Sequence, residues 1–439
     1  MRMVVDIFRG FCTSRSRGGS SSVIVFFVIS LLAPAFLLAA PAPRPAPSPL
    51  ILPAPVETNL GVMDTRHYRI HTNLETTFAE ELGRRMNAMY DDYSRRLQDF
   101  TPSDETANAK FEVYLFKQRD DYRRFTKNKV PNTGGVFMPA RNTLAAFLEG
   151  QGRDALRRTL QHEAFHQFAH SVINPDLPPW LNEGLATVFE EGIFLGRSFK
   201  LGEVPPRRVR QLQLDIDSGR LIPFREIMMM SLDDWSVALN DKQGSRGATQ
   251  YNQAWAMCHF LIFAQKNGDT IYRKRFLDML TRIHKGDDGM TAFTASFSDN
   301  IDGFETQFRK FATGLESTPA ATMIERQDIL ADMLTILAQR GHRFDDVEDF
   351  RKTLANGGYR MSYQKGDLKW TTEADPTTYF NNLNGDELTR DEMKFESRSN
   401  APIPDLVLRA PRQLKLRTRF HDAPQGKIEH EVLIEEAAR

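Results

Sequence analysis

The chain has 439 residues, and its 57 lysines and arginines balance its 57 aspartates and glutamates, so the formal net charge is zero. This length leaves room for two or three domains with a sizeable core. The balanced charge gives no strong attraction to nucleic acid, which we exclude as a partner. Cys12 and Cys258 are the only cysteines. No disulfide between them is expected, so the fold does not depend on oxidation.

The N-terminus has the pattern of an export signal. Four arginines within the first 17 residues precede the uncharged, apolar run 22–40, and small residues follow it. Two outcomes stay open for residues 1–40. They are a signal peptide, cleaved near Ala42, or a retained anchor, since about 20 apolar residues span a bilayer. We expect an exported protein that is periplasmic, extracellular or attached to the outer side of a membrane through 22–40.

A linker and the first elements of a folded unit follow. Residues 41–56 contain seven prolines, a composition typical of an extended, semi-rigid linker. The folded part is expected to begin near Asn59. Alternating apolar residues predict strands at 67–71 and 111–116, and an apolar stripe predicts a long helix over 75–100 between them. A short helix is predicted next, over 120–127. A hairpin follows it, and its two strands are predicted at 133–139 and 142–147.

Histidine and glutamate side chains with the spacing of a metal site lie in a helical run, 154–172. His162 and His166 are four residues apart, so they share one helix face, about 6 Å apart along the axis. Two such imidazoles can hold one zinc ion, and Glu163 lies beside them to act on a water molecule. For this motif alone, a solvated helix face is the alternative. His170 continues the stripe, but at about 12 Å from His162 it is too far to share one tetrahedral ion.

A second motif offers a third ligand. Two prolines at 178–179 signal a helix start, and the sequence W-L-N-E-G at 180–184 follows. Glu183 can supply the third ligand and leave a fourth position for water. The metzincin class is excluded, because Ala169 and Val172 stand where that class needs a glycine and a third histidine.

The two motifs together resemble the gluzincin zinc metallopeptidases, whose aminopeptidase branch carries H-E-x-x-H and then W-L-N-E-G on the next helix. The resemblance is closest to the secreted bacterial peptidase-MA-like family and extends over 60–315. Sixteen residues separate His166 from Glu183, slightly fewer than that branch usually has. The resemblance implies an α+β fold with a small N-terminal mixed sheet packed on a zinc-bearing helix, then a mainly helical subdomain. It also implies Zn²⁺ on His162, His166 and Glu183, and a peptide or protein substrate.

The resemblance assigns further roles. In that clan an edge strand binds the substrate backbone, so 134–138 or 142–147 could act by strand addition, with ordinary core strands as the alternative for both. Tyr251 begins the stretch Y-N-Q-A-W, which resembles the Y-x-x-G-A helix whose tyrosine faces the substrate carbonyl, although Ala254 and Trp255 replace glycine and alanine. A phenol there can donate a hydrogen bond to the oxyanion. The alternative is a tyrosine that caps the helix or fills the core.

The remaining pattern is mostly helical, with predicted helices over 205–218, 223–230, 272–283, 324–339 and 344–354. Residues 241–249 are predicted to form a mobile loop. Alternation at 413–420 and 427–435 predicts a C-terminal β-hairpin. We therefore divide the folded part into a gluzincin-like domain, 57–318, and a C-terminal extension, 319–439, to which no function is assigned.

These observations predict zinc-dependent hydrolysis of peptide bonds, with Glu163 as general base and Tyr251 as oxyanion donor. The alternative is a non-hydrolytic cell-envelope binding or scaffold module that keeps a zinc site. Glu163 argues against this alternative, because a structural site needs no general base and closes with a fourth protein ligand. The choice between endopeptidase and exopeptidase stays open, since no G-x-M-E-N element for a free N-terminus occurs.

Overall fold

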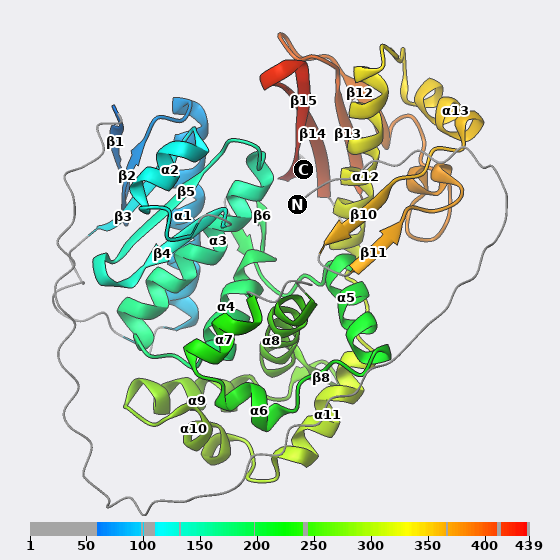
Figure 1. Ribbon diagram of the computed structural model, residues 1–439. Helices are drawn as coiled ribbons and strands as arrows, with labels where there is room; N and C mark the ends of the chain where they lie inside the picture. The colour runs from blue at the N-terminus through cyan, green and yellow to red at the C-terminus, as the bar shows by residue number, and fades with distance from the viewer. Residues whose placement is uncertain are drawn as a thin grey trace, which may run out of the picture. The chain divides into compact units, whose positions relative to one another are not determined.

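The computed structural model describes residues 59–97, 100, 110–130, 133–196, 198–239, 245–365, 368–410 and 414–436. The predicted signal or anchor at 1–40 and the whole of the linker, 41–56, fall outside these residues. Within them, no helix combines the length and apolar character needed to cross a membrane. The fold is α+β, as the sequence predicts, with a mixed five-stranded sheet, a helical middle and a four-stranded antiparallel sheet (Figure 1).

The N-terminal sheet has the strand order β1-β2-β3-β5-β4. Its strands are β1 Gly61–Asp64, β2 Tyr68–Thr72, β3 Phe111–Phe116, β4 Gly135–Met138 and β5 Thr143–Phe147. The inner pairs β2–β3 and β3–β5 are parallel and the outer pairs antiparallel. A parallel pair needs a long crossover, and helix α1, Thr76–Arg96, supplies it between β2 and β3. The predicted strands are confirmed as β2 and β3, and the predicted hairpin as β4 and β5. Strand β1 was not predicted from the sequence.

Helices cover both faces of this sheet. Alternate residues of β3 and β5 point to opposite sides of the sheet. Val113 and Leu144 therefore pack with α1 and with the helix that follows β5, whereas Phe116 and Phe147 pack with the short helix that follows β3. Helix α2 spans Arg119–Phe125, and α3 spans Arg153–Phe168 and continues as a π-helix over Ala169–Ile173. The helix that carries the histidine motif therefore lies directly on the sheet, as predicted.

The middle of the chain is helical: α4 Pro179–Glu190, α5 Pro206–Asp217, α6 Phe224–Met229, α7 Leu232–Leu239, α8 Ser245–Phe263, α9 Arg273–His284, α10 Gly289–Ser296 and α11 Ile301–Thr313. Two short hairpins interrupt it, β6 Ile193–Leu195 with β7 Ser198–Lys200, and β8 Gln265–Lys266 with β9 Asp269–Thr270. The predicted loop over 241–249 is wrong from Ser245 onward, where α8 begins. Thr249 is buried there and its hydroxyl donates to Asp215 at 2.7 Å, so tertiary packing outweighs the low helix propensity of Gly247.

The C-terminal part begins with α12 Pro319–Gln339 and α13 Val347–Gly357. Its strands are β10 Ser362–Lys365, β11 Leu368–Thr371, β12 Met393–Glu396, β13 Asp405–Ala410, β14 Leu414–Ala423 and β15 Lys427–Glu436. The predicted hairpin is β14–β15, and β12 and β13 extend it into an antiparallel sheet of order β12-β13-β14-β15. Helix α12 packs on this sheet around a hydrophobic core that includes Leu330, Leu334, Leu406 and Phe420.

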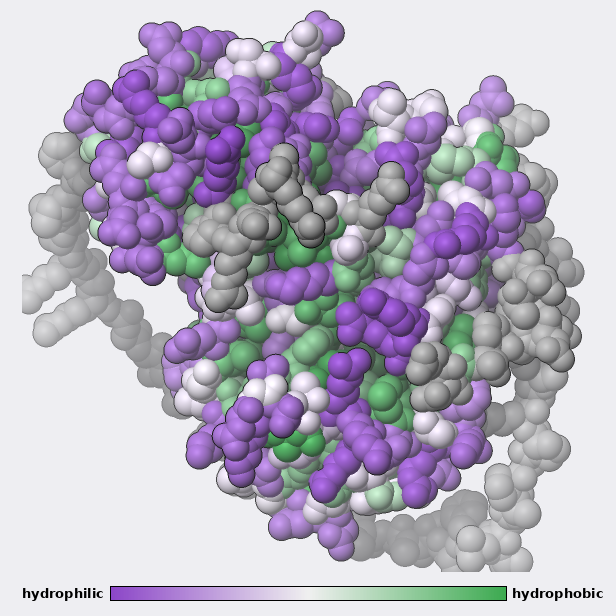
Figure 2. All heavy atoms as spheres, turned by 180° about the vertical axis from the view of Figure 1, so that it is seen from behind, coloured by the Kyte–Doolittle hydropathy of each residue, from purple (hydrophilic) through white to green (hydrophobic). Residues whose placement is uncertain are grey.

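The surface seen from behind is mostly hydrophilic, and apolar residues show mainly in the recesses between polar ones (Figure 2). Short 3₁₀ helices at Pro139–Arg141, Pro376–Phe380 and Pro424–Gly426 complete the regular structure. Most of the large apolar side chains in the described residues are buried in the hydrophobic cores.

Candidate metal centre

The structure brings His162, His166 and Glu183 together, although Glu183 comes from a different helix. The Nε2 atom of His162 lies 3.2 Å from Glu183 Oε2, and Nε2 of His166 lies 3.5 Å from the same oxygen. One ligand atom of each of the three side chains lies within 4.8 Å of the others, and the group could hold a metal ion. Helix α3 presents the two histidines on one face, and α4 places Glu183 opposite them.

These distances suit a small tetrahedral ion. Zinc binds imidazole nitrogen and carboxylate oxygen at about 2.0–2.1 Å, so two ligand atoms on one tetrahedral ion are about 3.3 Å apart. The separations of 3.2 and 3.5 Å match this value. Two nitrogens and one carboxylate oxygen are also the donor set of catalytic zinc sites, which keep a fourth position open. The residues present therefore fit zinc.

The other ring nitrogen of each histidine faces a second side chain, within hydrogen-bond distance for His166 and at ion-pair distance for His162. Nδ1 of His166 lies 2.9 Å from Asn182 Oδ1, and Nδ1 of His162 lies 3.4 Å from Glu190 Oε2. Such partners fix the ring orientation and leave Nε2 as the ligand atom. Sequence reasoning missed Glu190. It lies seven residues after Glu183, two helical turns on, and therefore on the same face of α4.

The electrostatics favour a cation at this site. Burial alone lowers the pKa of His162, but the carboxylates of Glu183 and Glu190 outweigh burial and hold that pKa well above its ordinary value. Burial alone raises the pKa of Glu183, but the two imidazoles outweigh it and hold the carboxyl well below its usual range. When both imidazoles are neutral, the carboxylates of Glu163, Glu183 and Glu190 leave the site negative. A divalent ion would compensate this charge.

Glu163 contacts the edge of the N-terminal sheet. Its Oε2 accepts a hydrogen bond from the backbone N–H of Phe137 in β4 at 2.7 Å. Strand β4 is an edge strand, so the N–H of Phe137 points away from the sheet. Strand β5 lies between β3 and β4 and has both sides paired. Strand addition at 142–147 is therefore excluded, and 134–138 remains as the edge.

Tyr251 faces the same site from α8. Burial raises its pKa well above the ordinary value, and the nearby carboxylates of Glu183 and Glu163 raise it further. Its ring centroid lies 5.5 Å from that of Trp235. The prediction that Tyr251 begins its helix is wrong, because α8 starts at Ser245. The alternative in which Tyr251 caps the helix is therefore excluded.

His170 is not part of the metal-ligand group. Its ring centroid lies 5.5 Å from that of Phe137.

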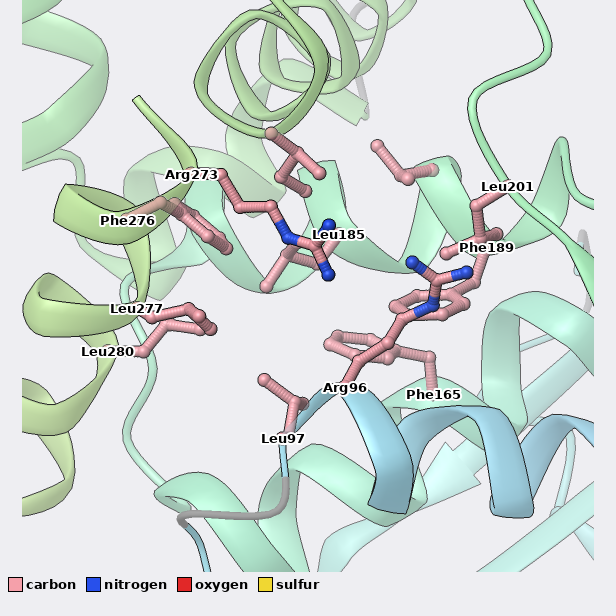
Figure 3. Close-up of a pocket in the computed structure, with 12 residues that line it drawn as sticks. Arg96, Leu97, Phe165, Leu185, Phe189, Leu201, Arg273, Phe276, Leu277 and Leu280 are labelled. Carbon is pink, nitrogen blue, oxygen red and sulfur yellow. The ribbon is translucent and has the colours of Figure 1, made fainter. Parts of the chain in front are cut away.

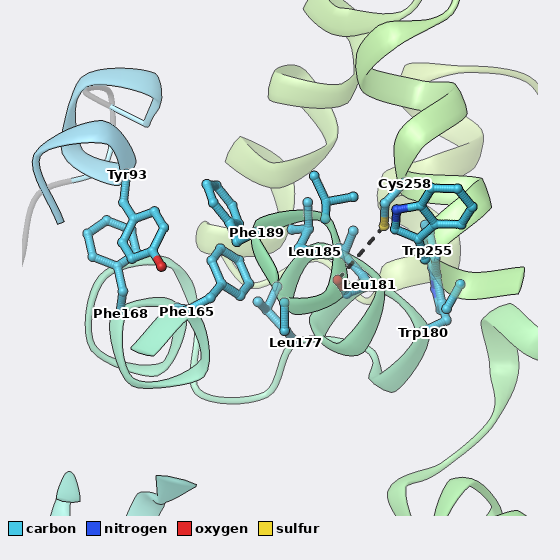
Figure 4. Close-up of a cluster of buried hydrophobic side chains, with 14 of the residues drawn as sticks. Tyr93, Phe165, Phe168, Leu177, Trp180, Leu181, Leu185, Phe189, Trp255 and Cys258 are labelled. Carbon is cyan, nitrogen blue, oxygen red and sulfur yellow. Dashed lines mark hydrogen bonds between the residues drawn. The ribbon is translucent and has the colours of Figure 1, made fainter. Parts of the chain in front are cut away.

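Buried contacts fix the helices that carry the site. The side-chain amide of Gln161 on α3 donates to the carbonyl oxygens of Phe189 and Gly192, both at 2.9 Å, at the end of α4. The ring of Phe165 stacks on Phe189 with centroids 4.9 Å apart, in the apolar cluster between these helices (Figure 4). A Cβ atom on Gly184 would lie 2.5 Å from the carbonyl oxygen of Ala254. The glycine after Glu183 is thus required by the close crossing of α4 and α8.

The fold and site define an α+β protein with a His–His–Glu group suited to a metal ion. A family model described as "Protein of unknown function (DUF1570)" matches residues 157–278. The matched stretch runs from α3 into α9 and contains all five residues that sequence analysis assigns to the site. No curated protein matches the chain.

Proposed function

We propose that this chain is a zinc-dependent peptidase of gluzincin type. The observation that carries the proposal is that Glu163 stands beside the His–His–Glu group and at the same time contacts the edge strand β4. A general base, a metal site and an edge strand with no further strand paired to it are the three parts needed to hold an extended peptide and hydrolyse it.

The chain's own residues have separate tasks in this proposal. Zinc, when bound by His162, His166 and Glu183, supplies a Lewis acid that polarises the scissile carbonyl and lowers the pKa of water. Glu163 takes a proton from the attacking water and delivers it to the leaving amine. The phenol of Tyr251 donates a hydrogen bond to the oxyanion. The outer edge of β4 pairs with the substrate backbone and aligns it, through backbone groups other than the N–H of Phe137, which donates to Glu163.

A non-hydrolytic module that keeps a structural zinc is supported less well. A structural zinc site normally has four protein ligands. Within the described residues, the only group of histidine, cysteine, aspartate and glutamate that could hold a metal has three members. The position of Glu163 has no use in a structural site, whereas hydrolysis requires a base there.

Metal content tests the ligand set. The purified folded part is expected to bind close to one zinc per chain, and His166→Ala to lose it, because two remaining ligands hold the ion weakly. His170→Ala is the matched control. This histidine is one helical turn further along and outside the ligand group, so full occupancy is expected. Elemental analysis measures both variants, together with chelator-sensitive cleavage of a denatured protein. Full zinc in His166→Ala would refute the assignment.

Tyr251→Phe tests the oxyanion donor. Only a hydroxyl is removed, so zinc content and stability are expected to stay nearly unchanged, while kcat falls by about 10²-fold or more, the usual effect of losing one such donor. Tyr272→Phe is the control, because its hydroxyl donates to Gln307, at 2.6 Å, and is not assigned to the site. An unchanged kcat in Tyr251→Phe would mean that this tyrosine fills the core and does not stabilise the oxyanion.

We also propose that the protein acts outside the cytoplasm. The arginine-flanked apolar run 22–40 supports this. A reporter enzyme that works only in the cytoplasm, fused after residue 60, is expected to be inactive. Activity of that fusion would refute export.

A further inference from the structure

The void behind α3, α4 and α9 has room for only a few water molecules. Its volume is about 50 Å³, and apolar side chains such as Phe165, Leu185 and Leu280 close around it (Figure 3). These three side chains are buried. Leu185 leaves α4 about 200° round the helix from Glu183, so the void lies on the far side of α4 from the metal ligands. No substrate group fits there, and the groups that act on a substrate lie on the side of Tyr251.

An indole from helix α7 packs beside Tyr251. Trp235 is 1% exposed, whereas the other residues over 232–237 are exposed. The ring centroids of Trp235 and Tyr251 are 5.5 Å apart, and the rings are inclined at 63°. The backbone carbonyl oxygen of Trp235 accepts a hydrogen bond from the side-chain amide of Gln250, at 3.5 Å. Gln250 immediately precedes Tyr251 in α8, so both contacts hold Trp235 at this tyrosine.

The indole N–H of Trp235 is a buried donor. Its Nε1 atom has no hydrogen-bond partner of normal length and angle among the described residues. A buried donor without a partner is unfavourable and calls for an explanation. Burial and the carboxylate of Glu183 raise the pKa of Tyr251, whereas the N–H of Trp235 lowers it. A donor has this effect on a phenol when it is directed at the phenol oxygen. The indole N–H therefore points toward the hydroxyl of Tyr251.

The hydroxyl of Tyr251 thus lies between a donor and an acceptor. Trp235 offers an N–H on one side, and Glu183 offers a carboxylate oxygen on the other. A phenol oxygen can accept a hydrogen bond and donate its own proton at the same time. An N–H on its lone pair leaves the O–H to point toward the metal ligands. Linked hydrogen bonds also polarise one another, so a phenol that accepts from an indole is a stronger donor.

We propose that Trp235 is a positioning residue for the oxyanion donor. Its N–H donates to the phenol oxygen of Tyr251 and holds the phenol O–H toward the oxyanion. Hydrogen bonds of this kind are often long in the free enzyme and shorten when substrate binds. Trp235 itself does not touch the substrate. This inference rests on the proposed function, because it assigns Trp235 to the reaction in which Tyr251 takes part.

Kinetics of the zinc-loaded full chain test this role. Trp235→Phe removes the N–H and keeps an aromatic ring, so kcat is expected to fall about tenfold, the effect of one hydrogen bond. Zinc content should stay unchanged, and KM should change by less than about twofold, because the lost bond acts in the transition state. Trp255→Phe is the matched control. Trp255 is equally buried in α8, its Nε1 likewise has no partner among the described residues, and its ring lies 5.5 Å from that of His259. Its kcat should stay within about twofold.

A double variant separates positioning from packing. Tyr251→Phe already lacks the hydroxyl that Trp235 orients, so adding Trp235→Phe should lower kcat no further. A further tenfold fall would show that Trp235 acts by packing, and would overturn the proposal. If Tyr251→Phe is impaired and Trp235→Phe is fully active, this inference fails alone and the peptidase proposal stands. If the unchanged chain hydrolyses no peptide, or if Tyr251→Phe is fully active, the role of Trp235 fails together with that of Tyr251.

Nuclear magnetic resonance detects the hydrogen bond without zinc or turnover. The chain has four tryptophans, and the indole N–H signal that is missing in Trp235→Phe belongs to Trp235. In the chelator-treated full chain, this signal is expected to move upfield in Tyr251→Phe, because the ring remains and only the acceptor oxygen is lost. Trp255→Phe should leave it in place. A Trp235 signal that does not move in Tyr251→Phe would overturn the contact, whatever the kinetics show.

Discussion

Glu163→Gln is expected to keep its zinc and to lose peptide hydrolysis by about 10²–10⁴-fold in kcat, the usual contribution of a general base. An amide cannot take the proton of the attacking water. It can still accept the hydrogen bond that Phe137 N–H donates to Glu163 Oε2 at 2.7 Å, so the contact between α3 and β4 should persist. The variant therefore separates loss of the base from loss of structure. Elemental analysis and kinetics on one denatured protein substrate measure the two effects.

Glu190→Gln is the matched comparison for this variant. Glu190 is also a carboxylate near the histidines, 3.4 Å from Nδ1 of His162, but it faces the outer nitrogen rather than the ligand nitrogen. Loss of such an outer partner typically costs 10–100-fold in metal affinity or activity. Added zinc should restore part of the activity of Glu190→Gln and none of the activity of Glu163→Gln. Activity of Glu163→Gln within tenfold of the unchanged chain would mean that another group is the base.

The ligand group of His162, His166 and Glu183 could be predicted from the sequence because its geometry is local. His162 and His166 are fixed relative to each other by one helical turn, and Glu183 follows within a short, recognisable motif. The side chains that face the Nδ1 atoms of the two histidines were harder to predict. The helix that begins at Pro179 was predicted, and the spacing of seven residues places Glu190 on the face of Glu183. Nothing in the sequence indicates that this face brings Glu190 to Nδ1 of His162. The role of Phe137 was not predictable, because a backbone N–H has no sequence signature.

The fold shows the same division between local and distant determinants. The apolar stripe of α1 and the alternation in β3 and β14 are properties of single segments, and those elements were predicted with small errors at their ends. Strands β12 and β13 were missed, because short strands are stabilised by their neighbours rather than by their own sequence. The helical turns at 245–249 were mistaken for a loop because the hydrogen-bond partner of Thr249 is Asp215, which lies in a different helix, α5.

One buried arginine joins three distant parts of the chain. Arg157 on α3 is 5% exposed and lies in hydrogen-bond contact with Glu81 of α1 at 2.9 Å, Asp154 at 2.7 Å and Glu431 of β15 at 2.5 Å. Its partners Glu81 and Glu431 are 76 and 274 residues away in the sequence. The backbone N–H of Val432 also donates to Asp154 at 2.7 Å. The C-terminal strand β15 is therefore attached to the first turn of the helix that carries both histidines.

Arg157→Met is expected to lower the free energy of unfolding at neutral pH by about 3–5 kcal/mol. Removing one partner of a buried ion pair leaves uncompensated charge, and here three carboxylates lose the same cation. Burial alone would raise the pKa of Glu431, but His421 and Arg157 outweigh it and lower that pKa to about 2. Since this folded-state pKa lies below the ordinary value of 4.5, the stabilisation is present above about pH 4.5 and is lost as the pH falls toward 2.

The difference between Arg157→Met and the unchanged chain should accordingly be large at pH 7 and shrink in acid, where the carboxylates of the variant can be protonated. Denaturant unfolding at several pH values measures this difference. Arg158→Met is the control, because Arg158 is the next residue of α3 but is exposed, and its effect should stay within about 0.5 kcal/mol. A loss in Arg157→Met no larger than in Arg158→Met, or one independent of pH, would show that β15 and α3 are held together by packing alone.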